Sequence, residues 1–99
     1  FAFPVRPHKN TTEGGQSSLD SSLLMLCSNL CDGDTHGADH LPTLLAGRAG
    51  GTRKTGRNLD YLDRGSDNRR ACSLYLSMMD RMGVTLDRFG DTSQRLRDL

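Results

Sequence analysis

The chain has 99 residues, a formal net charge of +1 and a hydrophobic content of 34%. Nowhere does it approach the run of about 18 apolar residues that a membrane-spanning segment requires. A charge so close to zero gives no long-range field to attract nucleic acid or an anionic membrane, and the length allows one small domain at most.

The first half of the chain predicts a polar lead-in followed by two short strands. Residues 1–18 include two prolines and a polar, glycine-rich stretch, which together predict irregular structure. The apolar run at 23–26 lies between turn-forming residues and predicts a strand that is buried on both faces. Beyond a polar loop, residues 41–47 predict a second short strand, with Pro42 where no ladder donor is needed.

The second half predicts one main helix. Residues 58–63 suggest a short edge strand. Residues 67–82 predict the helix, with Asp67 as its N-cap and Gly83 as its C-terminal capping glycine. Residues 84–99 form a polar tail with isolated apolar anchors. Apolar side chains spaced by three and four share one face of the helix, which we expect to pack in the core: Ala71, Tyr75, Met78, Met79 and Met82.

The loop at residues 47–57 carries four cationic side chains, Arg48, Arg53, Lys54 and Arg57. Such a set is able to hold an anionic ligand. The phosphate-loop pattern is not met, because Thr52 stands where its second glycine belongs. A solvated, flexible loop is the simpler interpretation.

The apolar residues are few and mostly leucine. Leucine supplies 15 residues, isoleucine is absent, and Leu, Val and Phe together make 20 of the 99. Chains below about 20% of these residues tend to be disordered. Two or three short strands, one main helix and long loops do not complete a layered fold, and the sequence starts at Phe1. We therefore expect a C-terminal fragment of a longer α/β protein, with 1–18 as a lead-in and 19–99 as part of one larger domain.

Seven metal-capable side chains lie close together after the first predicted strand: Cys27, Cys31, Asp32, Asp34, His36, Asp39 and His40. One interpretation is a hydrolase metal site, in which Asp32 follows the C-terminal end of a buried strand, where α/β folds place their ligands. A carboxylate with one or two imidazoles suits zinc or a similar divalent ion. Such an ion activates water or holds a phosphoryl or sulfuryl oxygen.

The same loop permits other interpretations. Cys27, Cys31, His36 and His40 read C-x3-C-x4-H-x3-H, which is close to zinc-knuckle spacing and suggests a module for single-stranded nucleic acid. A solvated, carboxylate-rich turn with two histidines would need no ligand. A calcium loop is disfavoured. Asp32, Asp34, His36 and Gly37 match its positions one, three, five and six, but Thr43, preceded by Pro42, stands where its bidentate glutamate belongs.

A family resemblance covers most of the chain, residues 11–99. The stretch LDSSLLMLCSNLCDGDTHGADHLPTLLAGR at 19–48 resembles the C-terminal region of the HXXSHH family, bacterial proteins of unknown function common in planctomycetes. The likeness continues through four shorter pieces, at 54–57, 74–77, 80–84 and 87–91. The signature that names the family is absent from this segment, which implies that it lies upstream.

That family is similar to the alkaline phosphatase and sulfatase superfamily, which carries Asp-His-Gly after one late strand and a histidine before a Pro-led strand. Asp32-Gly33 resembles the first element without its histidine, and His36 or His40 resembles the second. Residues 37–40 also resemble the Gly-Arg-Asp-His of a related bacterial family. The resemblance therefore implies an alkaline-phosphatase-like fold and four metal ligands: Asp32, His36, His40 and Asp39.

Two departures from the family bear on the site. Ala38 stands where many members carry a second histidine, which affects the number of ligands retained. Cys31 stands where the family has a small polar residue, so the cysteines are not part of the family's chemistry and the zinc-knuckle interpretation is weakened.

The resemblance implies a hydrolase of phosphate or sulfate esters that uses a divalent metal, zinc, and acts on a small anionic ester. Its nucleophile and remaining ligands would lie upstream, so we expect this fragment alone to be inactive. The missing N-terminal part, or a self-associating partner, would complete the fold, and the family implies an exported or periplasmic bacterial protein. The alternatives are a zinc-knuckle nucleic-acid module, disfavoured by the charge and the few aromatic residues, and a non-catalytic relative of the hydrolase fold.

Overall fold

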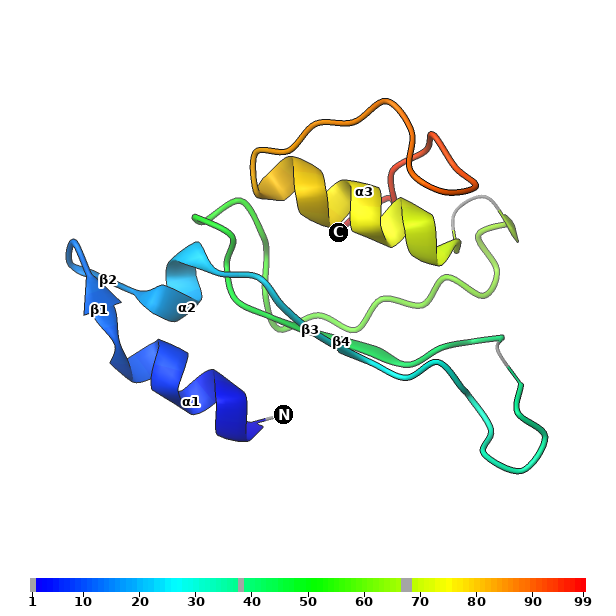
Figure 1. The fold of residues 1–99 in the computed structure, drawn as a ribbon, viewed down its shortest axis with the longest axis horizontal. Coiled ribbons are helices and arrows are strands. Elements are labelled where there is room, and N and C mark those ends of the chain that lie inside the picture. The colour runs from blue at the N-terminus through cyan, green and yellow to red at the C-terminus, as the bar shows by residue number, and fades with distance from the viewer. Residues whose placement is uncertain (1, 38, 67–68) are drawn as a thin grey trace. The chain divides into compact units, whose positions relative to one another are not determined.

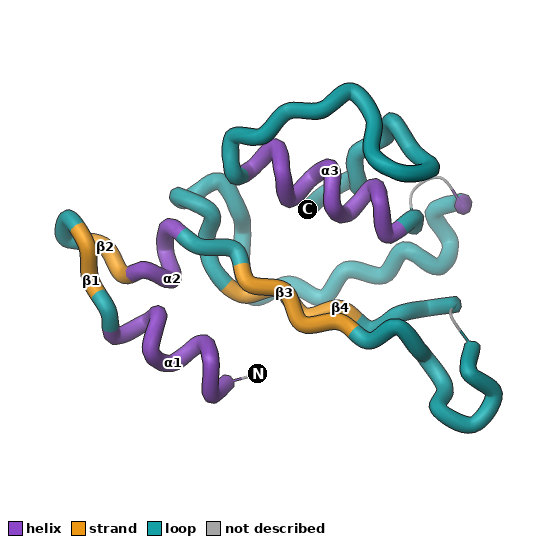
Figure 2. Tube along the Cα trace, in the orientation of Figure 1, coloured by secondary structure: helices purple, strands orange, loops and turns teal. Residues whose placement is uncertain are grey.

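The computed structural model describes residues 2–37, 39–66 and 69–99. This part of the chain contains three helices and two small antiparallel sheets, so the expected α/β class is confirmed. Figures 1 and 2 show the elements in chain order: α1 (Ala2–Asn10), β1 (Thr12–Glu13), β2 (Gln16–Ser17), α2 (Ser18–Ser21), β3 (Leu24–Cys27), β4 (Thr43–Ala46) and α3 (Ala71–Arg81).

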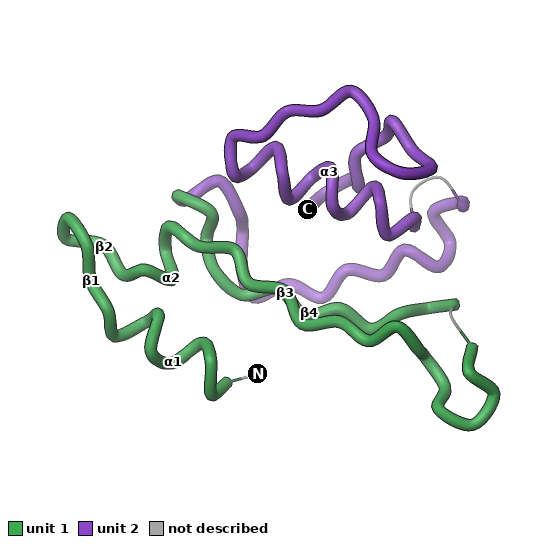
Figure 3. Tube along the Cα trace, viewed as in Figure 1, with its two compact units in different colours: residues 1–50 green, residues 51–99 purple. Residues whose placement is uncertain are grey.

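The chain divides into two compact units, residues 1–50 and residues 51–99 (Figure 3). Unit 1 holds α1, α2 and both sheets, and unit 2 holds α3 with the segments around it. Among the described residues, no helix is both long enough and apolar enough to cross a bilayer.

Residues 2–17, which were predicted to be irregular, instead form α1 and the β1–β2 hairpin. Pro4 falls in the first turn of α1, where backbone N–H groups lack intrahelical partners, so proline costs little there. Gly14 and Gly15 lie at φ +57° and +84°, as a two-residue hairpin turn of the primed type requires.

A capping box fixes the single turn of α2. The Ser17 hydroxyl accepts a hydrogen bond from the Asp20 amide at 3.2 Å, and the Asp20 carboxylate accepts one from the Ser17 amide at 3.3 Å. The Ser17 hydroxyl also donates to this carboxylate at 2.7 Å, and that hydrogen bond holds the pKa of Asp20 below its ordinary value. Two otherwise unpaired amides at the start of the helix are satisfied in this way.

The segment after β4 returns to α2 through close backbone contacts. Gly47 has φ +101°, and a Cβ atom at this position would overlap the Ser22 carbonyl oxygen, so only glycine fits. Three backbone hydrogen bonds follow: Arg48 N to Leu19 O at 3.2 Å, Ala49 N to Ser22 O at 3.0 Å, and Gly50 N to Asp20 O at 2.8 Å. The carbonyl groups at the end of α2 are thereby paired.

Strands β3 and β4 form an antiparallel hairpin, so both predicted strands exist within slightly different bounds. The prediction that the first strand is buried on both faces is wrong. Leu26 is 46% exposed and Leu44 is 57% exposed. The physical reason is that a sheet of two strands needs further elements to cover its faces. The register pairs Leu24 with Ala46, Met25 with Leu45, Leu26 with Leu44 and Cys27 with Thr43.

The predicted helix forms as α3, but it begins later than expected. Its N-cap is Arg70, which makes no side-chain capping hydrogen bond. Asp67, the predicted cap, lies outside the described residues. The edge strand predicted at 58–63 is wrong, because these residues make no strand pairing.

The end of α3 is a Schellman motif, which confirms the predicted role of Gly83. Gly83 has φ +82° and donates its amide to the Asp80 carbonyl at 3.1 Å. The Val84 amide donates to the Met79 carbonyl at 2.9 Å. A left-handed residue is required at this point, and glycine adopts that conformation without steric cost.

The buried face of α3 differs from the predicted one. Ser73, Leu76 and Ser77 are buried, with Leu76 fully enclosed, whereas Met82 on the predicted face is 51% exposed. The tail lies against the serines. The Leu96 amide is 2.8 Å from the Ser77 hydroxyl and 3.2 Å from the Ser73 carbonyl. Small hydroxyl side chains allow the tail backbone to approach and to pair its polar groups, which methionines would prevent.

Arg95 provides a second connection between the tail and α3. Its Nε and Nη2 atoms lie 2.8 and 3.1 Å from the two Asp80 carboxylate oxygens, and Nη2 also donates to the Leu86 carbonyl at 2.6 Å. This bidentate pair holds the pKa of Asp80 below its ordinary value of 3.8. Both side chains remain about one-third exposed, at 35% and 33%.

The apolar core is small in both units. The buried hydrophobic residues of the described chain are Ala49 in unit 1 and Leu76 and Leu99 in unit 2. Backbone and small polar groups therefore supply much of the cohesion within each unit.

We expect Gly47→Ala to destabilise the chain much more than Gly50→Ala. Both positions have positive φ, so each substitution carries a backbone cost of about 1 kcal/mol. Only at Gly47 would the added methyl group meet the Ser22 carbonyl, which adds about 1–3 kcal/mol. Urea unfolding and the exchange rates of the Arg48 and Ala49 amides measure the difference, and equal losses in the two variants would contradict this assignment.

The ion pair between Asp80 and Arg95 should make the stability of the chain depend on pH. Its folded pKa lies below the ordinary value, so its contribution to stability is complete above that value and is lost as the pH falls through the folded pKa. Urea midpoints between about pH 6 and pH 2.5 should therefore fall more steeply for the wild type than for Asp80→Asn. Asp63→Asn, which leaves the Arg95 contact intact, should follow the wild type. Parallel curves for wild type and Asp80→Asn would contradict the prediction.

Candidate functional site

The loop between β3 and β4, residues 28–42, folds back on itself to make a smaller hairpin. The Cys31 amide donates to the Gly37 carbonyl at 2.7 Å, and Asp32 and Gly37 form an isolated antiparallel bridge. A tight turn at 33–36 joins the two sides. Asp32, a predicted site residue, therefore lies in the bridge at the base of this smaller hairpin.

Asp32 organises the turn with its carboxylate. Oδ1 accepts the Asp34 amide at 2.9 Å, and Oδ2 accepts the Thr35 hydroxyl at 2.9 Å. The Asp34 amide and, after it, the Thr35 hydroxyl hold the pKa of Asp32 below its ordinary value. Each carboxylate oxygen has a second lone pair, and ligating carboxylates in metal sites are themselves hydrogen-bonded. These two hydrogen bonds therefore fit both interpretations of Asp32, as a ligand to a cation and as a residue that only stabilises the turn.

The two histidines of the loop both adopt left-handed backbone conformations. His36 has φ +53° and His40 has φ +56°, a region that non-glycine residues seldom occupy. His36, His40 and Asp39 are all exposed. These three predicted ligands therefore lie at the surface of the loop, and Ala38 between them lies outside the described residues.

The loop does not assemble a complete metal site from its own side chains. Across residues 2–37, 39–66 and 69–99, no group of three or more His, Cys, Asp or Glu side chains is placed to hold an ion. The proposed ligands Asp32, His36, Asp39 and His40 do not include a group of three that could hold an ion, and neither do the knuckle residues. Cys27 and Cys31 are exposed free thiols. Among the described residues, no more than two of these side chains therefore lie together in a position to hold one ion.

The position of Asp32 also differs from the expectation drawn from α/β folds. Strand β3 ends at Cys27, and its partner β4 is antiparallel to it. Asp32 lies beyond that end, within the smaller hairpin, instead of following the strand directly. Its orientation therefore comes from the turn at 33–36 and not from the edge of a parallel sheet.

The cations of the basic loop lie in different units. Arg48 belongs to unit 1, where it is 4.0 Å from the Asp20 carboxylate. Arg53 and Arg57 belong to unit 2, where their charges interact with each other and where that of Arg53 also interacts with Arg81. Sequence reasoning missed Arg81, because only the tertiary fold brings the end of α3 to this loop.

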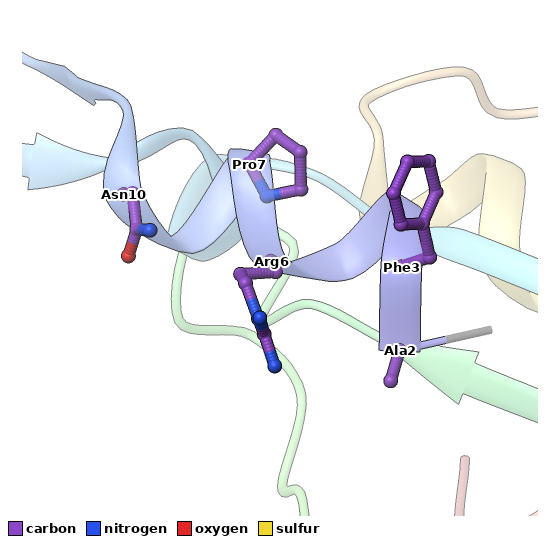
Figure 4. A pocket seen from close by; sticks show the side chains of 5 residues that line it. All are labelled: Ala2, Phe3, Arg6, Pro7 and Asn10. Carbon is purple, nitrogen blue, oxygen red and sulfur yellow. The ribbon is translucent and has the colours of Figure 1, made fainter.

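A shallow hollow on α1 is lined entirely by residues of that helix (Figure 4): Ala2, Phe3, Arg6, Pro7 and Asn10. Phe3 is 90% exposed, so the hollow is open to solvent. We assign it no catalytic role.

No family model, no curated protein and no solved structure matches this chain. The resemblance to the HXXSHH family therefore remains a hypothesis based on the motifs of the sequence.

The hydrogen bonds of Asp32 can be tested by its titration. Thr35→Val removes the hydroxyl donor and leaves the Asp34 amide in place, so the pKa of Asp32 should rise part of the way toward its ordinary value. Carboxyl carbon chemical shifts followed against pH by NMR give the value directly. Thr43→Val, a change outside the turn, is the matched control. An unchanged Asp32 titration in Thr35→Val would show that the Thr35 hydroxyl does not donate to the Asp32 carboxylate.

Proposed function

We propose that this chain is part of a metal-dependent hydrolase of phosphate or sulfate esters, with an alkaline-phosphatase-like fold, and that the β3–β4 loop supplies ligands to its divalent ion. The main support is Asp32, an exposed carboxylate with a lowered pKa that two hydrogen bonds orient. His36 follows in the same turn, and Asp39 and His40 follow shortly after it.

Zinc fits the chemistry of these donors, since it binds both carboxylate oxygen and imidazole nitrogen. A catalytic zinc ion has three protein ligands and one open position. Among the described residues, no three His, Cys, Asp or Glu side chains lie together, so the remaining ligands would come from residues outside this chain or from a second copy. The exposed Leu26 and Leu44 side chains of the β3–β4 hairpin are consistent with further strands covering it.

Within such a site, each residue has a distinct role. Asp32 would be a direct anionic ligand, already ionised at neutral pH and held by its two donors. His36 or His40 would complete this chain's share of the ligands to one ion and orient a small anionic ester beside it, with Asp39 as the second candidate for the carboxylate ligand. When bound, the ion would supply Lewis-acid polarisation of the ester oxygen. We propose an exported or periplasmic location for the intact protein, on the family resemblance alone.

Zinc titration followed by calorimetry and NMR on the whole chain tests this proposal. Asp32→Ala should weaken zinc binding by about tenfold or more, because it removes a ligand. Asp34→Ala retains the backbone amide that contacts Asp32 and serves as the matched control. The double variant Cys27→Ser/Cys31→Ser should bind zinc as the wild type does.

Other outcomes favour the alternatives. Loss of zinc binding in the double cysteine variant, with little effect of Asp32→Ala, would establish a zinc knuckle built from Cys27, Cys31, His36 and His40. Such a module would bind single-stranded nucleic acid. Failure of the wild-type chain to bind zinc even at millimolar concentration, where a pair of protein ligands is enough for weak binding, would contradict the metal-ligand role and favour a non-catalytic relative.

A further inference from the structure

The tail, residues 84–99, is bound by side chains of α3 and of the segment before it (orange to red in Figure 1). The structure describes all of the tail, and none of it belongs to a helix or strand. The Phe89 ring meets the Tyr75 ring edge to face, with the ring centroids 6.1 Å apart. A Cβ atom added at Gly90 would stand 2.6 Å from the Cys72 Sγ atom. The first docked residues of the tail therefore fit the helix closely.

Polar groups continue this contact along the helix. Arg70, the N-cap of α3, donates through Nη1 to the Asp91 carbonyl at 2.6 Å. The hydroxyl groups of Ser73 and Thr92 lie 3.3 Å apart, and Thr92 is buried. The hydrogen bonds of the Leu96 amide and the bidentate ion pair near the end of α3, both described above, complete the series. The tail thus contacts α3 from its first turn to its last.

The segment before α3 binds the last residues of the tail. Arg57 donates through Nη1 to the Asp98 carbonyl at 2.7 Å, and the Tyr61 hydroxyl donates to the Arg97 carbonyl. Nη1 of Arg64 lies 2.5 Å from Oδ2 of Asp98. Two successive carbonyls and one carboxylate are therefore held by side chains from a distant part of the chain.

These contacts define a tail-binding surface, which consists of the contacted face of α3 and four side chains that precede the helix: Arg57, Tyr61, Arg64 and Arg70. This surface holds residues 89–99 much as it would hold an extended peptide. The connection at 84–88 is exposed and belongs to no helix or strand, so it can extend without loss of core packing. The tail of a second copy has the same sequence, and the surface is therefore complementary to that tail as well.

We propose that the tail-binding surface is an interface between two copies of this chain, which exchange residues 89–99 so that each tail binds the other copy. Exchange of an identical segment keeps the contacts of the closed monomer and forms a closed two-fold dimer. A segment on a short tether has an effective concentration of about 1 mM, so the dimer forms as the chain approaches that concentration. The surface lies wholly within unit 2 and does not depend on the metal ligands proposed in unit 1.

Two charge-reversed variants of the whole chain test the exchange. Asp80→Arg places two arginines opposite each other in the closed monomer, and Arg95→Asp places two aspartates there. When the two variants are mixed, the exchanged heterodimer pairs opposite charges at both contacts. It should form at a concentration about tenfold lower than the wild-type dimer, because two repulsive contacts become ion pairs. Native mass spectrometry and sedimentation equilibrium measure this concentration.

The matched control is the double variant Asp80→Arg/Arg95→Asp, which restores the ion pair within one chain. It should self-associate as the wild type does, and its urea midpoint shows that the reversed charges are compatible with folding. A mixture that stays monomeric would overturn the proposal. Homodimers of either single variant that form as readily as the heterodimer would also overturn it, because exchange between identical chains leaves like charges opposed.

The wild type gives a test that needs no substitution. At millimolar concentration, a mixture of isotope-labelled and unlabelled chains should show NMR contacts between the Tyr75 ring of one copy and the Phe89 ring of the other. Absence of these contacts at that concentration would overturn the proposal.

Discussion

A shortage of large apolar side chains constrains every part of this structure. With 20 Leu, Val and Phe residues in 99, the chain buries few of them, and hydrogen bonds formed at close backbone approach take over much of the cohesion. The 48–50 amides pair with the end of α2, and the Leu96 amide pairs with the serine face of α3. Each contact depends on a small residue, Gly47 in unit 1 and Ser73 and Ser77 in unit 2, because a larger side chain would keep the two backbones apart.

The same constraint explains the state of the β3–β4 hairpin and its loop. The hairpin exposes Leu26 and Leu44, so it contributes little buried area to unit 1. Core packing therefore stabilises the loop of this hairpin only weakly, and the loop depends on hydrogen bonds within itself. Asp32 does so by accepting two hydrogen bonds within the turn at 33–36. Those bonds also orient the carboxylate and lower its pKa, which links the local structure to the proposed ligand role.

The two units present opposite chemistries. The loop of unit 1 carries carboxylates and imidazoles, which bind cations, whereas the 52–57 loop of unit 2 carries guanidinium groups, which bind anions. In each case, local hydrogen bonds position the charged side chain. Asp32 is held by donors from its own turn, and Arg57 and Arg81 are held by backbone carbonyls.

The sequence by itself determined the local elements with strong signals: both strands of the β3–β4 hairpin, the body of α3, and its end at Gly83. It also held a signal for the β1–β2 hairpin in Gly14 and Gly15, which a search for two-residue turns would have found. The metal ligands remain a prediction. Only the tertiary structure decided which face of α3 is buried and which cations meet. The spacing of apolar residues predicted that the methionine face of α3 would be buried. The serine face is buried instead, because the tail backbone lies close to it and hydrogen-bonds with Ser73 and Ser77. Arg81 likewise donates to the Thr52 carbonyl, a contact between segments far apart in the chain that no local pattern encodes.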